Sequence, residues 1–410
     1  MTSRSTSRPQ ANPFDPQVLR PSRRRQEVAP GVHHFVGYGF GTASAALTGD
    51  GWVVIDTGGN PRAAADIRQE LRGLSDRPVR YVIYTHGHID HCPGAEALLD
   101  EGAQVIAHEN VPLRFDRYLM LEEHTKLINS IQFRVDLSGV RFRFIYPHIT
   151  YSRDEAFELG GRRFELFHGK GETDDATVVW LPDARAAFVG DFFTWVFPNV
   201  GNPLKIVRYE KEWFETLERV RDLDPAVLVP GHGRAITDRR ELRAALRDWI
   251  DVLRLIHAGV VEHLNRGATL EETVAGVRLP RRLQESRFLN PAYGSLEFAI
   301  TNVYRRYSGW IDFDAAKLSP APRAEVAALL MDAVGDEGRL LDTARRLQAE
   351  GRLQHALEVI DVLAHGRPAN REAHAIRAEI LDALAAASGN LIARDVYLWA
   401  ADGARKAAGG

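Results

Sequence analysis

The chain is poor in the features that mark several specialised classes of protein. Its 410 residues include a single cysteine, Cys92, so an intramolecular disulfide is impossible and a reducing compartment is favoured. No stretch approaches the roughly 18 apolar residues that span a bilayer, and the first residues lack the apolar core of a secretory signal. The formal net charge is only −3, which gives no general attraction to nucleic acid or anionic lipid. We therefore expect a cytoplasmic protein that binds neither nucleic acid nor membrane.

The composition is that of a globular protein with an ordinary core. Hydrophobic residues make up 45% and charged residues 26%, and the length suggests two or three domains. Residues 1–29 are an exception, because they are polar and include a basic run at 23–25, so we expect a disordered or arm-like segment. Cys92 directly follows a histidine, and we expect it to be a small packed thiol.

Two regions of the chain have different hydrophobic patterns. Between residues 30 and 238, short apolar runs alternate with helical stretches, which is typical of sheets covered by helices. These runs are Ala45–Leu47, Trp52–Ile55, Val79–Tyr84, Gln104–Ala107, Phe142–Ile145, Arg163–Phe167, Thr177–Leu181, Ala187–Val189 and Val227–Val229. From 239 to 410 the spacing is helical, and residues 339–386 have the form of a tetratricopeptide-like hairpin. The patterns predict one domain over 30–238 and another over 239–410.

The most informative segment is a cluster of four metal-ligand side chains within residues 86–91. His86, His88, Asp90 and His91 directly follow the apolar run 79–84, so they stand where a predicted strand ends. Neutral imidazoles and a carboxylate are ligands that zinc prefers. A chain that turns sharply after a strand can aim alternate side chains at two different ions. The cluster therefore predicts a metal site.

Three further candidate ligands lie far along the chain, each where an apolar run meets a loop. Glu172 precedes one run, Asp191 ends the next, and His232 follows the last. Other interpretations stay open at this point. Glu172 would also suit an acidic surface loop, Asp191 could cap a helix, and His232 could be a turn residue. His168 is an alternative ligand in place of Glu172.

At these positions the sequence resembles the metallo-β-lactamase superfamily over roughly residues 30–235. The resemblance rests on Asp56-Thr57-Gly58, on residues 85–91, on Val189-Gly190-Asp191 and on the Pro-Gly-His-Gly run at His232. Most members carry a histidine where this chain has Glu172, and a glutamate there is similar to the alkyl sulfatase branch. The second region agrees, because residues 290–296 (NPAYGSL) and 303–312 (VYRRYSGWID) resemble the alkyl sulfatase dimerisation domain.

The resemblance implies an α/β fold class, with an αββα metallo-β-lactamase sandwich followed by an all-helical dimerisation domain. It also implies two zinc ions: one held by His86, His88 and Glu172, the other by Asp90, His91 and His232, with Asp191 bridging them. Manganese or iron also suits a site rich in carboxylates. With neutral imidazoles, the three carboxylates and one hydroxide balance four positive charges. Asp90 and Asp191 are therefore expected to support a hydroxide that is nucleophilic near neutral pH.

The expected substrate is a small-molecule ester, in the first place an alkyl sulfate. A sulfate group needs cationic and amide donors, and the loop 192–209 offers Asn199, Lys205 and Arg208 as substrate-binding candidates. The sequence of this loop differs from the alkyl sulfatase pattern. Residues after about 365 are Ala-rich and helical, without the lipid-carrier-like domain of long-chain alkyl sulfatases, so we expect an ester other than a detergent.

Two other functions stay open. The same ions with a different pocket would serve a thioesterase, a lactonase or another carboxylic ester hydrolase. A non-catalytic helical scaffold with a vestigial metal site is the third interpretation, although all seven ligand positions are filled. We also expect a homodimer formed through the helical domain, with the apolar stretch Leu296–Trp310 partly buried between subunits.

Overall fold

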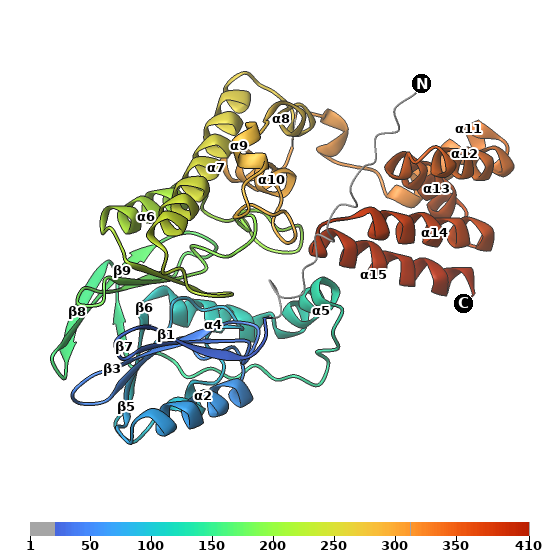
Figure 1. Cartoon of the computed structure of the whole chain (residues 1–410). Coiled ribbons are helices and arrows are strands. Elements are labelled where there is room, and N and C mark those ends of the chain that lie inside the picture. The colour runs from blue at the N-terminus through green and yellow to red at the C-terminus, as the bar shows by residue number, and fades with distance from the viewer. Residues whose placement is uncertain (1–20, 312, 410) are drawn as a thin grey trace, which may run out of the picture. The chain divides into compact units, whose positions relative to one another are not determined.

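The computed structural model describes residues 21–409 except residue 312, and the chain forms two compact units (Figure 1). Among the described residues, unit 1 contains those up to Thr125 together with Val140–Tyr307, and unit 2 contains Lys126–Gly139 and those from Ser308 onward. The change from β-rich to helical sequence falls at Arg239, where α7 begins. Unit 1 continues beyond this point to Tyr307, because α7 and α10 share one apolar core with a β-sheet.

Unit 1 is built on two β-sheets. The first has strand order β1-β2-β3-β4-β5-β6-β7 and the second has order β12-β11-β10-β9-β8. The first sheet is parallel from β4 to β7, so the carboxyl ends of these strands meet at one edge. The strands are β1 Arg24–Ala29, β2 Val32–Val36, β3 Ala43–Leu47, β4 Trp52–Ile55, β5 Val79–Ile83, β6 Gln104–His108, β7 Ile149–Tyr151, β8 Asp154–Leu159, β9 Arg162–Gly169, β10 Ala176–Leu181, β11 Ala186–Gly190 and β12 Val227–Pro230.

Helices cover the outer face of each sheet, which confirms the predicted αββα sandwich. Branched side chains from both sheets, among them Val53, Ile83, Val179 and Val229, form the core between the sheets. Apolar residues of α2, α3 and α4 pack on the first sheet, and those of α6, α7 and α10 pack on the second. The helices of this unit are α2 Pro61–Leu74, α3 Ala95–Leu98, α4 Asn110–Met120, α6 Glu210–Asp222, α7 Arg239–Asn265, α8 Leu270–Gly276, α9 Arg281–Gln284 and α10 Leu296–Tyr307, while α5 Glu122–Phe133 passes from unit 1 into unit 2.

The long helix α7 shows how local sequence determines where a helix begins and which face is buried. The Asp238 side chain accepts a hydrogen bond from the backbone N–H of Glu241 and caps the first turn. Leu242, Leu246 and Leu253 lie on the buried face at helical spacing. Capping and periodicity agree, so the helix begins where the sequence pattern becomes helical, at Arg239.

The first strand corrects the expectation for the N-terminal segment. Residues 1–20 lie outside the described residues, but Arg24–Ala29 pairs antiparallel with β2 and is not an arm. Arg23 and Arg25 form ion pairs with Asp66 and Glu70. The basic run is thus held by acidic residues of α2, a long-range pairing that composition does not reveal.

The apolar run Phe142–Ile145, predicted as a strand, has no regular secondary structure. Its aromatic rings pack on α4 instead, a helix that the sequence patterns did not indicate. The rings of Phe144 and Phe115 are stacked with their centroids 4.2 Å apart. Alternating aromatic residues can cover a helix as well as a sheet, so alternation alone does not distinguish the two.

Unit 2 is helical, and its helices pack through apolar side chains such as Ala344, Ala356 and Ile360. Gly351, with φ 75°, forms the tight turn between α12 and α13. Its helical elements are the 3-10 turn Ala315–Lys317, α11 Arg323–Val334, α12 Glu337–Ala349, α13 Leu353–Gly366, α14 Arg371–Ala387 and α15 Leu391–Ala408. Throughout the described part of the chain, every helix is too short or too polar to cross a membrane.

Candidate metal centre

The turn after β5 is held by a buried carboxylate at the end of β4. Asp56 Oδ1 accepts a hydrogen bond from Thr85 N at 2.7 Å, and its Oδ2 accepts one from Thr85 Oγ1 at 2.7 Å. Oδ2 also lies 2.8 Å from His91 Nδ1. Because a carboxylate only accepts, Nδ1 of His91 carries the proton and Nε2 is left facing the centre. Asp56 has φ 58°, a left-handed conformation that aspartate tolerates better than most residues.

The ligand-type side chains gather in two groups at the carboxyl ends of strands from both sheets. The His86 group consists of His86, His88 and Asp191, and the His232 group consists of Asp90, His91 and His232. Within each group the potential ligand atoms lie within 4.8 Å of one another. Six of the seven predicted ligands are therefore brought together in sets of three.

Asp191 lies between the two groups. Its Oδ2 is 3.7 Å from His86 Nε2, whereas its Oδ1 is 3.5 Å from His91 Nε2 and 3.5 Å from His232 Nε2. The two oxygens of this one carboxylate thus face different sets of imidazoles. That is the arrangement a carboxylate needs to share two cations.

Two buried atoms of the centre lack the hydrogen bonds that buried polar groups normally make. His91 Nε2 and Asp191 Oδ1 are buried without a hydrogen-bond partner. Burial alone would lower the pKa of His91, but the carboxylates of Asp191, Asp90 and Asp56 raise it to about 9. A cation at this point would satisfy both orphaned atoms and the excess negative charge, so the residues fit a metal ion.

Glycines allow the close packing around these side chains. A Cβ at Gly231, in the Pro-Gly-His-Gly run, would lie 2.2 Å from Asp191 Oδ1. A Cβ at Gly41 would lie 2.1 Å from the backbone oxygen of Asp90. Glycine is required at both positions because any side chain would displace a ligand-bearing segment.

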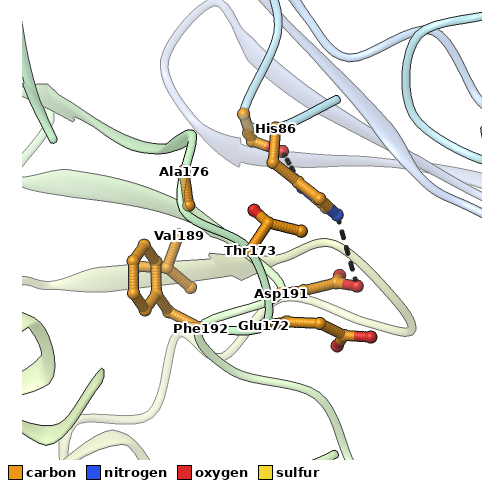
Figure 2. A pocket seen from close by; sticks show the side chains of 8 residues that line it. His86, Glu172, Thr173, Ala176, Val189, Asp191 and Phe192 are labelled. Carbon is orange, nitrogen blue, oxygen red and sulfur yellow. Dashed lines mark hydrogen bonds and ion pairs between the residues drawn. The ribbon is translucent and has the colours of Figure 1, made fainter. Parts of the chain in front are cut away.

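Glu172 lines the same pocket as His86 and Asp191, but it belongs to neither group of three. Figure 2 shows the carboxyl groups of Glu172 and Asp191 pointing in the same direction. Glu172 Oε1 lies 2.5 Å from Arg208 Nη1 and accepts a hydrogen bond from Asn199 Nδ2 at 2.9 Å. Burial, only partly offset by Arg208, raises the pKa of Glu172 to about 7. Its role as a zinc ligand stays a prediction.

The three predicted substrate-binding residues lie around this glutamate. Arg208 and Asn199 both contact Glu172, and Arg208 also donates to the backbone oxygen of Asn199. Burial, together with the positive charge of Arg208, lowers the pKa of Lys205 to about 8. The loop therefore places two cationic side chains beside the candidate metal centre.

The sequence patterns missed several residues of the centre. Burial and the carboxylate of Glu172 raise the pKa of Tyr293 well above its usual range, so its phenol lies close enough to sense that charge. Asp175 Oδ2 accepts hydrogen bonds from Gly87 N at 3.1 Å and from Arg114 Nε at 2.7 Å, which supports the 86–91 turn. Tyr293 lies in the NPAYGSL stretch, which indicated the family resemblance but did not indicate a role for this tyrosine.

The alternative ligand His168 and the neighbouring thiol Cys92 belong to neither group. The ring of His168 is stacked on that of His108, with centroids 3.7 Å apart, and its Nδ1 bonds the backbone oxygen of Ala176. Cys92 is buried, and its Sγ donates to the backbone oxygen of His86 at 3.1 Å. The expectation of a packed thiol is confirmed.

Comparison with known families agrees with this architecture. The sequence model of the metallo-beta-lactamase superfamily matches residues 36–232, and that of alkyl sulfatase dimerisation matches residues 269–407. The chain therefore combines a metallo-β-lactamase superfamily domain with an alkyl sulfatase dimerisation region, and this combination supports the alkyl sulfatase branch of the superfamily. The dimerisation match begins within unit 1 and includes α10, so this region contributes to both compact units.

Individual relatives point the same way. A linear primary-alkylsulfatase from Pseudomonas is 27% identical over 381 residues, which cover 86% of this chain and 72% of the relative. An (R)-specific secondary-alkylsulfatase from Pseudomonas is 25% identical, with 91% of this chain and 61% of the relative covered. The structure of a stereoselective inverting sec-alkylsulfatase from Pseudomonas aligns with TM-score 0.84 at 23% identity, covering 98% of this chain and 69% of that one. This last likeness shows the shared fold.

Proposed function

We propose that this chain is a metal-dependent hydrolase of alkyl sulfate esters that works with two zinc ions. The placement of Asp191 carries the proposal, because its two oxygens face separate sets of imidazoles. The alkylsulfatase relatives support the substrate class. The alignments span 72% and 61% of the lengths of these two relatives.

Each of the two groups of residues would hold one zinc ion. His86 and His88, with Glu172 beside them, would hold one zinc, Asp90, His91 and His232 the other, and Asp191 both. Bound zinc supplies Lewis acidity toward an ester oxygen and lowers the pKa of water. Before an ion binds, burial opposes ionisation of Asp90, but the positive charge of protonated His91 lowers the pKa of Asp90 below its usual value, so this carboxylate is already ionised when a cation arrives. Asp90 and Asp191 thus supply the negative charge that retains cations.

The loop beside the centre would bind the sulfate group. Arg208 is only 4% exposed, and its guanidinium can donate two parallel hydrogen bonds to a tetrahedral oxyanion. Asn199 adds an amide donor, and Lys205 adds a second positive charge. A desolvated guanidinium next to a metal centre suits a sulfate ester better than a neutral carboxylic ester.

The alkyl part of the substrate would contact apolar side chains around the centre. The ring centroid of Phe40 is 4.9 Å from that of His232, and the Phe40 side chain is 39% exposed. Ile206 and Val207, adjacent to Lys205 and Arg208, are also exposed. Exposed apolar residues beside a buried charged centre would match an ester with a charged head and an apolar chain.

The test is release of inorganic sulfate from short primary and secondary alkyl sulfates by zinc-loaded protein, beside a panel of thioesters and lactones. We expect turnover of the sulfates, and the variant Arg208→Gln should raise KM for them while leaving zinc content unchanged. Turnover of thioesters or lactones alone would instead establish the carboxylic ester alternative. Protein that retains less than one zinc per chain after careful purification would favour the scaffold interpretation.

We also propose that the chain forms a homodimer, as the name of the matched dimerisation family suggests. Within the expected interface Leu296–Trp310, Ala299, Ile300 and Val303 of α10 are buried inside unit 1, so its exposed end would make the contact. Trp310, at the end of this stretch, and Phe313 and Leu329 beyond it have large exposed apolar side chains. A dimer mass at micromolar concentration is expected, and replacing these three residues together by serine should yield monomers; a wild-type monomer would contradict the proposal.

A further inference from the structure

The segment that carries Arg208 is hydrogen-bonded to helix α10, which lies about a hundred residues further along the chain. The side-chain amide of Asn302 makes two hydrogen bonds to one residue: its Oδ1 accepts from Arg208 N at 3.0 Å, and its Nδ2 donates to Arg208 O at 3.2 Å. Asn302 is 7% exposed and Arg208 is 4% exposed. Both backbone groups of Arg208 are thus satisfied by a single buried amide.

A second residue of α10 holds the positions that follow. Arg306, one helical turn after Asn302, donates from Nη1 to Glu210 Oε2 at 2.9 Å and from Nη2 to Glu212 Oε1 at 2.6 Å. Its guanidinium also lies 5.0 Å from the ring centroid of Tyr209. Four residues of segment 208–212 therefore contact α10, where the loop enters α6.

The preceding part of the loop has little regular structure of its own. Residues 199–209 contain no helix or strand, and Ile206 and Val207 are exposed. The direction of the Arg208 side chain thus depends on how its backbone is anchored. In the observed arrangement the guanidinium contacts Glu172 and the backbone oxygen of Asn199.

We infer that Asn302 is a positioning residue, which orients Arg208 for the sulfate group of the substrate. This inference rests on the proposed function. A guanidinium forms two parallel hydrogen bonds to an oxyanion only in a defined orientation, and a shift of about 1 Å at such a group is enough to lose roughly a hundredfold in kcat/KM. The helical region that matches the dimerisation family thereby has a second role, inside the substrate site of its own chain.

Two variants test the inference. Asn302→Leu removes both hydrogen bonds, and Asn302→Asp keeps the shape and the acceptor but loses the donor. Asn265→Asp, at the exposed end of α7, is the matched control. For zinc-loaded protein we expect Asn302→Leu to raise both KM for an alkyl sulfate and the inhibition constant of inorganic sulfate by roughly 10–100-fold. Asn302→Asp should raise them less, while zinc content stays at the wild-type value and kcat changes little.

Hydrogen exchange of the peptide 199–209 separates this inference from the proposed function. Faster exchange in Asn302→Asp than in the Asn265→Asp control supports the anchoring role, even if the wild type cleaves no alkyl sulfate and the proposed function fails. Unchanged exchange together with unchanged KM and sulfate inhibition would overturn the inference. A loss of kcat and zinc with unchanged KM would also overturn it, because the residue would then support the metal centre and not Arg208.

Discussion

The His232 group and the His86 group share a carboxylate but differ in charge. His91 of the first group faces Asp56, Asp90 and Asp191, and its pKa is raised to about 9 despite burial. Burial and the neighbouring His91 lower the pKa of His86 to about 4, and its Nε2 is hydrogen-bonded to His88 Nδ1 at 2.9 Å. Negative charge is therefore concentrated on one side of the centre. The His86 group approaches the same charge only if Glu172 joins it.

The largest expected effect removes the feature that the two groups have in common. In Asp191→Asn, one neutral oxygen remains where the carboxylate has two charged ones, so the side chain cannot serve both sets of imidazoles, and we expect zinc content to fall from two ions to one or fewer. Activity should fall by more than the roughly 100-fold that loss of an outer partner produces. Metal analysis and sulfate release measure both, with Asp183→Asn, an exposed aspartate paired with Arg162, as the control. Two tightly held ions in the variant would show that Asp191 is not shared.

The next effect should act on one group alone. Glu172→Gln keeps the shape of the side chain but removes its negative charge. Without that charge, the His86 group has less negative charge than the His232 group. We expect one ion to be lost or weakly held while the ion of the His232 group remains. Cobalt substitution followed by absorption spectroscopy reports the sites separately, and Glu165→Gln, a partly exposed carboxylate paired with Arg163, is the control. Equal weakening of both ions would remove the distinction drawn between the groups.

A smaller effect should fall on the His232 group. Asp56→Asn retains an oxygen for Thr85 N and tolerates φ 58°, but it weakens the hydrogen bond that orients His91. We expect zinc affinity at this group to fall by roughly 10–100-fold, as for other outer partners of metal-bound histidines. Competition with a chromophoric chelator measures it, with exposed Asp76→Asn as the control. An unchanged affinity would mean that packing alone orients His91.

The smallest effect concerns the loop and appears only with pH. Burial and the charge of Arg208 lower the pKa of Lys205 to about 8, so its ammonium is present below that pH and is lost as pH rises through it. KM for an alkyl sulfate should therefore rise above about pH 8. In Lys205→Arg the charge persists, because a guanidinium keeps its proton at much higher pH, and the rise should disappear. Identical KM profiles for the variant and the wild type would exclude Lys205 from sulfate binding.

Local patterns indicated much of this protein, because they depend on residues close together in the chain. The 86–91 cluster follows a strand, and the apolar periodicity of α7 and α10 is readable without any partner. The αββα class and the helical second region followed from the same patterns together with the family resemblance. The domain boundary predicted after residue 238 stays a prediction, although helical sequence begins there.

The sequence by itself determined which side chains lie at strand ends, which segments have the alternating pattern of strands and which have the periodicity of helices. Only the tertiary structure decided that Phe142–Ile145 covers a helix, that Arg23 and Arg25 meet acidic residues of α2, and that Glu172 pairs with Arg208. It also decided that Asn302 holds the backbone of Arg208. Each of these outcomes joins residues that are far apart in the chain, and such contacts depend on how sheets and helices pack, which no local spacing encodes.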